Sequence, residues 1–182
     1  MIYVSAGHFA EHPGASYGSF NEHDEAKIWA SILLNKLGHN GMMVPVGNLS
    51  NKVDFIKKMS YGPNTKKDIA IDIHFNSAKN SEGEHVGRGS ETLYFPGSVR
   101  GAKVATVIQS VLGTFFLPDR GIKEGYYQMN KAKGPDFFLS HTPCTAIIIE
   151  PEFIHRRAKI VERREVVCES LATALLTFLA QE

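Results

Sequence analysis

Three short apolar segments of the chain have the pattern of buried β-strands. They cover residues 1–7, 69–73 and 145–150, and further strands are expected at 42–46 and 90–95. In the second segment isoleucines alternate with Ala70 and Asp72, yet it is apolar enough to be buried on both faces. The third segment should end at Glu150, because Pro151 cannot continue a central strand.

Longer segments with apolar residues at helical spacing separate these strands. Helices are expected from Glu22 to Leu37, where Gly38 stops the pattern, and over 98–116 and 156–180. A shorter helix is expected at 50–60, before a turn at 61–64. This alternation predicts an α/β fold with one open, mixed and mostly parallel sheet of about six strands, flanked by helices on both faces. No linker or repeat appears, so residues 1–182 should form one domain.

Composition and charge exclude some partners without naming one. Apolar residues make up 43% and charged residues 21%, as in ordinary folded proteins. The formal net charge of +1 creates no field that would attract nucleic acid, and no segment approaches the roughly 18 apolar residues of a membrane-spanning helix. Cys144 and Cys168 form no CxxC pair and are expected to be buried, unbridged side chains.

Three residues that can bind a metal or move a proton lie at the ends of predicted strands, where ligands of such sheets collect. His8 follows the first strand, His74 follows the second, and Glu150 closes the third. Zinc hydrolases use three ligands of the His/His/Glu kind and keep one position open for water. Asp72 and Asn76 are available to orient the imidazole of His74.

Two early glutamates compete for the third ligand position. Glu22 is the better candidate, because it lies on the apolar stripe of the first helix and an inward carboxylate needs a partner. In the alternative, Glu22 forms a capping box with Ser19 and only reaches back to the backbone. Glu11 forms an HxxE pair with His8, of the kind that zinc carboxypeptidases use, but lies in a turn context. Spacing alone leaves the choice open.

Glu150 closes the most apolar segment of the chain. In a largely dry cleft its pKa would rise, which would suit it to act as general base and then general acid. The alternative is a glutamate that only marks the end of a strand.

The order of these segments resembles the zinc-dependent N-acetylmuramoyl-L-alanine amidases, particularly the catalytic domains of phage endolysins. The similar segments are SAGH with PGA, GSFNEHDEA, DIHFNS, GSETLYF, DRGIK and IIIEPEFI, within residues 3–155. The resemblance implies one zinc ion on His8, Glu22 and His74, with Glu150 as the catalytic residue. It also implies cleavage of the amide between the lactyl group of N-acetylmuramic acid and the L-alanine of the stem peptide.

Two departures from the family pattern concern Asp72 and residues 131–144. Many members carry a small hydroxyl residue at the position of Asp72, and 131–144 is longer and more aromatic than expected. Asn76 and Lys123 are predicted to bind substrate, Lys123 at the developing oxyanion or at a stem-peptide carboxylate. A solvated turn lysine is the alternative for Lys123.

The expected substrate is bacterial peptidoglycan, with neither nucleic acid nor membrane insertion involved. The N-terminus lacks the basic and then apolar segments of a secretion signal. We therefore expect synthesis in the cytoplasm without a signal peptide, release by a membrane-permeabilising partner, and action at the cell wall. A bacterial catalytic domain trimmed of its leader would have the same sequence features, so the choice between phage and bacterial origin stays open. The alternatives are a zinc carboxypeptidase acting on peptidoglycan peptides and a non-catalytic cell-wall-binding module.

Overall fold

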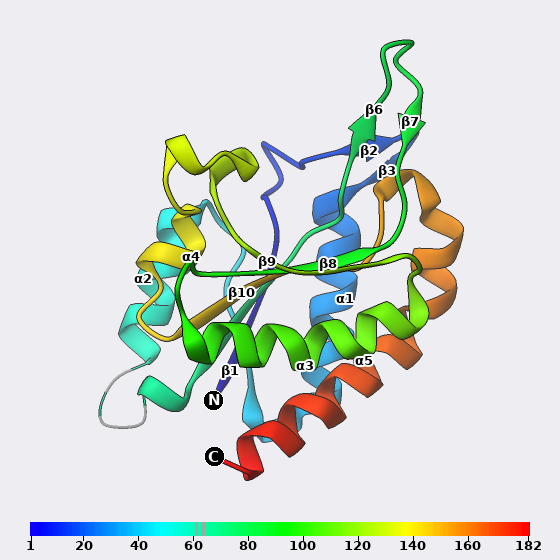
Figure 1. The fold of residues 1–182 in the computed structure, drawn as a ribbon. Helices are drawn as coiled ribbons and strands as arrows, with labels where there is room; N and C mark the ends of the chain where they lie inside the picture. The colour runs from blue at the N-terminus through cyan, green and yellow to red at the C-terminus, as the bar shows by residue number, and fades with distance from the viewer. Residues whose placement is uncertain (61, 63–64) are drawn as a thin grey trace.

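A six-stranded sheet forms the centre of the computed structural model, which describes residues 1–60, 62 and 65–182 (Figure 1). Its strands, in spatial order, are β4 (Gly41–Met43), β1 (Ile2–Ala6), β5 (Ile69–Ile73), β10 (Thr145–Glu150), β8 (Ser90–Tyr94) and β9 (Asp119–Glu124). The first four are mutually parallel, β8 is antiparallel to β10, and β9 is parallel to β8. The predicted mixed, mostly parallel sheet is confirmed.

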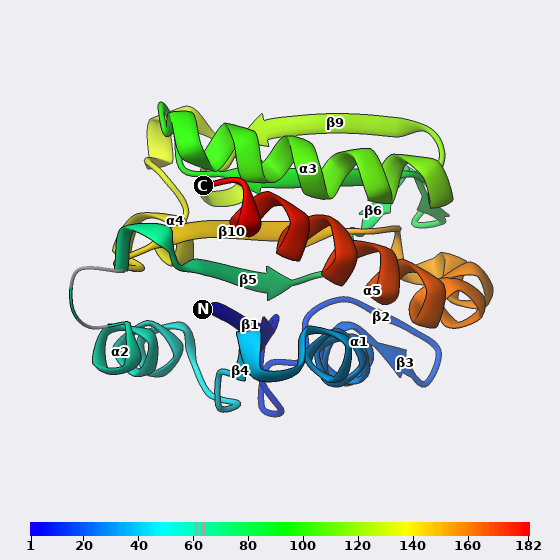
Figure 2. The same ribbon diagram turned by 90° about the horizontal axis from the view of Figure 1, so that it is seen from below.

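Helices cover both faces of this sheet, as predicted. The side chains of α1 (Glu22–Leu37), α3 (Val99–Phe115) and α5 (Arg157–Ala180) form one apolar core with Ile69, Ile71 and Ile73. The helices α2 (Leu49–Met59) and α4 (Phe137–His141) form a second core with Ala70 and Ile148 on the opposite face. Figure 2 shows α3 and α5 lying across the first face.

Shorter elements complete the chain. Two hairpins pair β2 (Ser16–Tyr17) with β3 (Phe20–Asn21) and β6 (Ala78–Lys79) with β7 (His85–Val86). Short 3₁₀ turns are η1 (Gly38–Asn40), η2 (Thr65–Lys67), η3 (Tyr127–Met129), η4 (Lys131–Lys133) and η5 (Ile154–Arg156). No helix of the described part combines the length and the apolar character needed to cross a membrane.

Several sequence expectations need correction in detail. The strand expected at 42–46 ends at Met43. Val44 still donates one backbone hydrogen bond to Val4, but Pro45 has no N–H with which to continue the pairing. Residues 131–144 contain the helix α4. Cys168 is buried, but Cys144 is only half-buried; both thiols are free. Of the turn predicted at 61–64, residues 61, 63 and 64 lie outside the described residues.

The parallel strands β1, β5 and β10 bring distant parts of the chain to one edge of the sheet. Ala6 is in register with Ile73, and Ile73 with Ile149. Two further backbone bonds continue the ladder beyond the strands, from the Gly7 N–H to the Ile73 carbonyl at 2.7 Å and from the His74 N–H to the Ile149 carbonyl at 2.9 Å. The residues that follow these strands are therefore fixed side by side.

Candidate metal centre and active site

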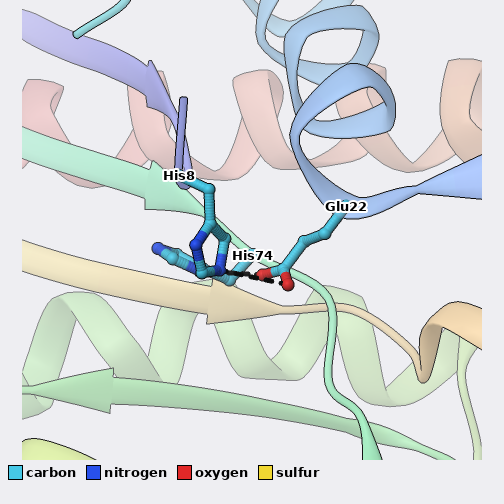
Figure 3. Close-up of side chains that lie close together, drawn as sticks. All are labelled: His8, Glu22 and His74. Carbon is cyan, nitrogen blue, oxygen red and sulfur yellow. Dashed lines mark hydrogen bonds and ion pairs between the residues drawn. The ribbon is translucent and has the colours of Figure 1, made fainter. Parts of the chain in front are cut away.

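His8, Glu22 and His74 meet at this edge of the sheet (Figure 3). Nε2 of His8 lies 3.1 Å from Oε2 of Glu22, and Nδ1 of His74 lies 2.9 Å from Oε1 of the same carboxylate. One ligand atom from each residue lies within 4.8 Å of the others. The structure thus brings together the three ligands that the sequence suggested, although they are far apart in the chain.

Two glycines allow the chain to pack this closely. A Cβ atom on Gly14 would lie 2.5 Å from Oε2 of Glu22 and 2.5 Å from Cδ2 of His8, and the residue has φ of +76°. A Cβ atom on Gly7 would lie 2.6 Å from the Ile73 carbonyl oxygen. His8 itself has φ of +57°, a left-handed conformation that non-glycine residues seldom adopt away from functional sites. Close packing around Glu22 and His74 therefore explains why the segments SAGH and PGA have glycine at these two positions.

Glu22 is buried where α1 begins, with only 4% of the residue exposed. Asn21, not Ser19, caps the helix, so the capping box with Ser19 is not formed. The Glu22 carboxylate instead accepts backbone hydrogen bonds from Ala15 at 3.0 Å and Phe75 at 3.1 Å. Burial alone would raise its pKa, but hydrogen bonds to His74 and His8 hold the pKa well below its usual range.

The three donors fit a zinc ion. Tetrahedral zinc with ligands at about 2.0–2.2 Å places neighbouring donor atoms about 3.3 Å apart, which is close to the observed His–Glu separations. Two imidazoles and one carboxylate leave a fourth position for water or substrate. Glu11 is exposed in the turn closed by backbone bonds between Phe9 and His12, outside the group of three.

His74 is held on its other side by Asp72. Oδ2 of Asp72 lies 3.1 Å from Nε2 of His74, so that Nδ1 faces Glu22. Burial opposes a charged imidazole, but the hydrogen bonds to Asp72 and Glu22 raise the pKa of His74 to about 10. Asp72 in turn pairs with Lys52 of α2, at 3.2 Å between Nζ and Oδ1. Lys52 could not be identified from the sequence, because a single lysine on a short polar helix gives no sign of burial.

Glu150 ends β10 beside His8 and His74, and all three line one pocket of about 340 Å³. Burial raises the pKa of Glu150 to about 7; the nearby charges of Glu91 and Glu22 add to the rise, and His74 opposes it. A carboxyl group with such a pKa can accept and return a proton near neutral pH.

The predicted substrate residues Asn76 and Lys123 converge on Glu91, not on the pocket itself. Nδ2 of Asn76 donates to Oε1 of Glu91 at 2.5 Å, and Nζ of Lys123 bonds to Oε2. Arg120, which no sequence pattern indicated, also contacts this oxygen at 3.0 Å. Glu91 is opposite Glu150 in the pairing of β8 with β10, so this cluster lies beside the end of β10.

A mostly apolar loop forms another part of the pocket wall. Tyr126, Tyr127 and Met129 line the pocket, as do Phe9 and Leu49. Gln128 and Met129 have φ of +52° and +54°, so the loop is held in a constrained turn. Phe9 and Leu49 also line a neighbouring hollow with Phe137, so apolar surface continues beyond the pocket.

Comparisons with known proteins agree with this architecture. A family model described as N-acetylmuramoyl-L-alanine amidase matches residues 2–173. The structure of an N-acetylmuramoyl-L-alanine amidase from Clostridium difficile 630 has a TM-score of 0.80 at 21% identity, covering 100% of this chain and 97% of that one. For the catalytic domain of the CD27L endolysin targeting Clostridia difficile, the TM-score is 0.73 at 22% identity, covering 97% and 96%. The N-acetylmuramoyl-L-alanine amidase AmiC2 of Nostoc punctiforme has a TM-score of 0.77 at 17% sequence identity, covering 99% of this chain and 97% of that one. None of the curated proteins matches the chain.

Proposed function

The chain belongs to the N-acetylmuramoyl-L-alanine amidase family and is a peptidoglycan amidase; on this basis we propose a zinc-dependent mechanism with named residues. His8, Glu22 and His74 hold one zinc ion, and Glu150 is the general base and acid. The bond cleaved joins the lactyl group of N-acetylmuramic acid to the L-alanine of the stem peptide. The observation that supports this assignment best is that His8, His74 and Glu150 line one pocket, with Glu22 joining the two imidazoles.

A bound zinc ion would supply a Lewis acid that polarises the scissile carbonyl and makes water a better nucleophile near neutral pH. Glu150 takes the proton released as water adds to the carbonyl carbon. It then delivers this proton to the alanine nitrogen as the C–N bond breaks. A pKa of about 7 suits Glu150 for both transfers.

Substrate binding is divided between the two borders of the pocket. Arg120 and Lys123 share the single carboxylate of Glu91, so the cluster keeps one positive charge. We assign this charge to a carboxylate of the stem peptide, with Asn76 holding Glu91 in place. The apolar loop at 126–129 contacts neutral parts of the substrate next to the scissile amide.

We also infer that residues 1–182 form one catalytic domain of the endolysin type. The family match over residues 2–173 supports a single unit, and the likeness to the CD27L catalytic domain supports the endolysin type. In this proposal a phage-infected cell makes the protein in its cytoplasm. A membrane-permeabilising partner then releases it to the cell wall.

Digestion of purified peptidoglycan with the zinc-loaded protein tests the proposal. Mass spectrometry should detect stem peptides with a free L-alanine amino group and glycan strands with unsubstituted lactyl groups. Release of single C-terminal amino acids would instead identify a carboxypeptidase. Peptidoglycan left undigested by the wild type and by Glu150→Gln alike would contradict catalysis and favour a wall-binding module.

A further inference from the structure

A buried lysine joins the two strand ends that carry the imidazole ligands. Lys52 of α2 is only 1% exposed. Its ammonium group donates to the carbonyl oxygen of Ala6 and to Oδ1 of Asp72. Ala6 is the last residue of β1 and lies two positions before His8. Asp72 lies within β5, two positions before His74, which directly follows that strand. One cation therefore contacts both segments from which the imidazoles project.

The carboxylate of Asp72 is fully enclosed, and both of its oxygens are bonded. Oδ1 accepts hydrogen bonds from the Ser5 hydroxyl at 2.5 Å and from Lys52 at 3.2 Å. Oδ2 lies 3.1 Å from Nε2 of His74, and Lys52 also reaches it, at 3.5 Å. Because Oδ1 is fixed by two donors, the side chain cannot rotate without losing them, and the ring of His74 keeps Nδ1 toward Glu22.

Stability alone does not account for this pair of charges. A buried ion pair contributes little to stability compared with well-packed apolar residues of similar size, whereas removal of one partner strands the other charge. A carboxylate that bonds the outer nitrogen of a metal-bound imidazole, in contrast, orients the ring and strengthens metal binding. The contacts of Asp72 match this second role.

We propose that Lys52 is a positioning residue of the metal centre, acting through Asp72 on His74 and through the Ala6 carbonyl on the segment before His8. The proposal rests on the zinc centre of the proposed function. Lys52 has no contact with the metal position in this account; it keeps the two imidazoles at the separation that one ion requires.

Zinc affinity of the metal-free protein, measured by competition with a chromophoric chelator, provides the test. Lys52→Met keeps an unbranched side chain only one atom shorter and removes the charge, and should weaken zinc binding by about 10- to 100-fold. Val53→Ala is the matched control. Val53 is the next residue of α2 and is equally buried, but it packs in the apolar core and lies outside the charged group. Its zinc affinity should match that of the wild type although its melting temperature falls.

A double variant separates positioning from a purely structural role and covers the case in which Lys52→Met does not fold. Lys52→Met with Asp72→Ala leaves no unpaired buried charge, so it should be more stable than Asp72→Ala alone. Its zinc affinity should nevertheless stay as low as that of Asp72→Ala, because His74 has lost its orienting partner.

The outcomes distinguish this proposal from the zinc centre itself. Wild-type zinc affinity in Lys52→Met or in the double variant would overturn the role of Lys52 and leave the zinc centre intact. Reduced amidase activity with unchanged zinc affinity would overturn it as well, because Lys52 would then act on the substrate. A wild-type protein that binds no zinc would overturn both proposals.

Discussion

Two parts of the pocket wall are built differently. On the side of β1 and β5, Glu22 and Asp72 are buried and the imidazoles of His8 and His74 are half-buried. Each of these groups has partners: Glu22 has four, and Asp72 is shared by Ser5, Lys52 and His74. On the side of residues 126–129, Tyr127 and Met129 are half exposed, at 51% and 50%, and make apolar surface. A buried charge is costly without its partners, so the first wall tolerates little change. The second wall can vary without such a cost.

The largest effect is expected from changing the charged wall. Glu22→Ala and His74→Ala each remove one of the three proposed ligands, so the zinc content should fall from one ion per chain to nearly none, and amidase activity should disappear with it. Elemental analysis after dialysis against trace zinc measures the content. Glu11→Ala is the matched control, since Glu11 is exposed and outside the group. Loss of zinc in Glu11→Ala but not in Glu22→Ala would reverse the assignment.

Removing the proton acceptor should separate chemistry from metal binding. Glu150→Gln is expected to lower kcat by about 10²- to 10⁴-fold, the usual contribution of a general acid or base. The zinc content should stay at one ion per chain, because Glu150 is not among the three grouped ligands. Turnover of soluble muropeptides, followed by chromatography, gives kcat. A variant that keeps more than half of the wild-type kcat would exclude Glu150 from proton transfer.

The same substitution should change how stability depends on pH. The folded pKa of Glu150, about 7, lies above its ordinary value of 4.5, so the folded state holds a proton that the unfolded state has released. The wild type therefore loses the stability that protonation of Glu150 contributes as pH rises from about 4.5 to about 7. Glu150→Gln has no titrating group at this position and lacks this loss. In zinc-free protein at pH 8, the variant should be more stable by about 1–3 kcal/mol, with almost no difference at pH 4.5. Denaturant unfolding at pH 8 and at pH 4.5 measures the free energy of unfolding of both proteins. An equal difference between variant and wild type at the two pH values would contradict the raised pKa of Glu150.

Changing the apolar wall should have the smallest effect. Tyr127→Ala and Met129→Ala are expected to raise KM for muropeptides by about 3- to 10-fold with little change in kcat, because each removes partly exposed contact area. Met59→Ala is the matched control, as Met59 is 45% exposed at the far end of α2. A fall in kcat with unchanged KM would show that this loop acts on the reacting atoms.

The same contrast explains what the sequence predicted. Periodicity identified α1 and β10 to the residue, since their apolar faces are long and regular. It placed His8, His74 and Glu150 at strand ends, and parallel pairing then brought them together. The segment of β9, DRGIKE, was recognised as a motif but not as a strand, because it contains a single apolar residue.

Residues whose role depends on distant partners could not be predicted from the sequence. Lys52 is buried because it meets Asp72, twenty positions later in the chain, and nothing in its own helix indicates this. Arg120 likewise reaches Glu91 only after β8 and β9 pair. The choice between Glu22 and Glu11 as a ligand also depends on distant contacts. Gly14 lets the chain pack closely around Glu22 and His8, and residue spacing alone does not reveal this contact.

Anomalous X-ray diffraction at the zinc absorption edge, from crystals of the zinc-loaded protein, would locate the metal and its ligands. One peak is expected, at about 2.0–2.2 Å from Nε2 of His8, Nδ1 of His74 and a carboxylate oxygen of Glu22. A peak bound elsewhere, or no peak at these residues under saturating zinc, would contradict the proposed zinc centre.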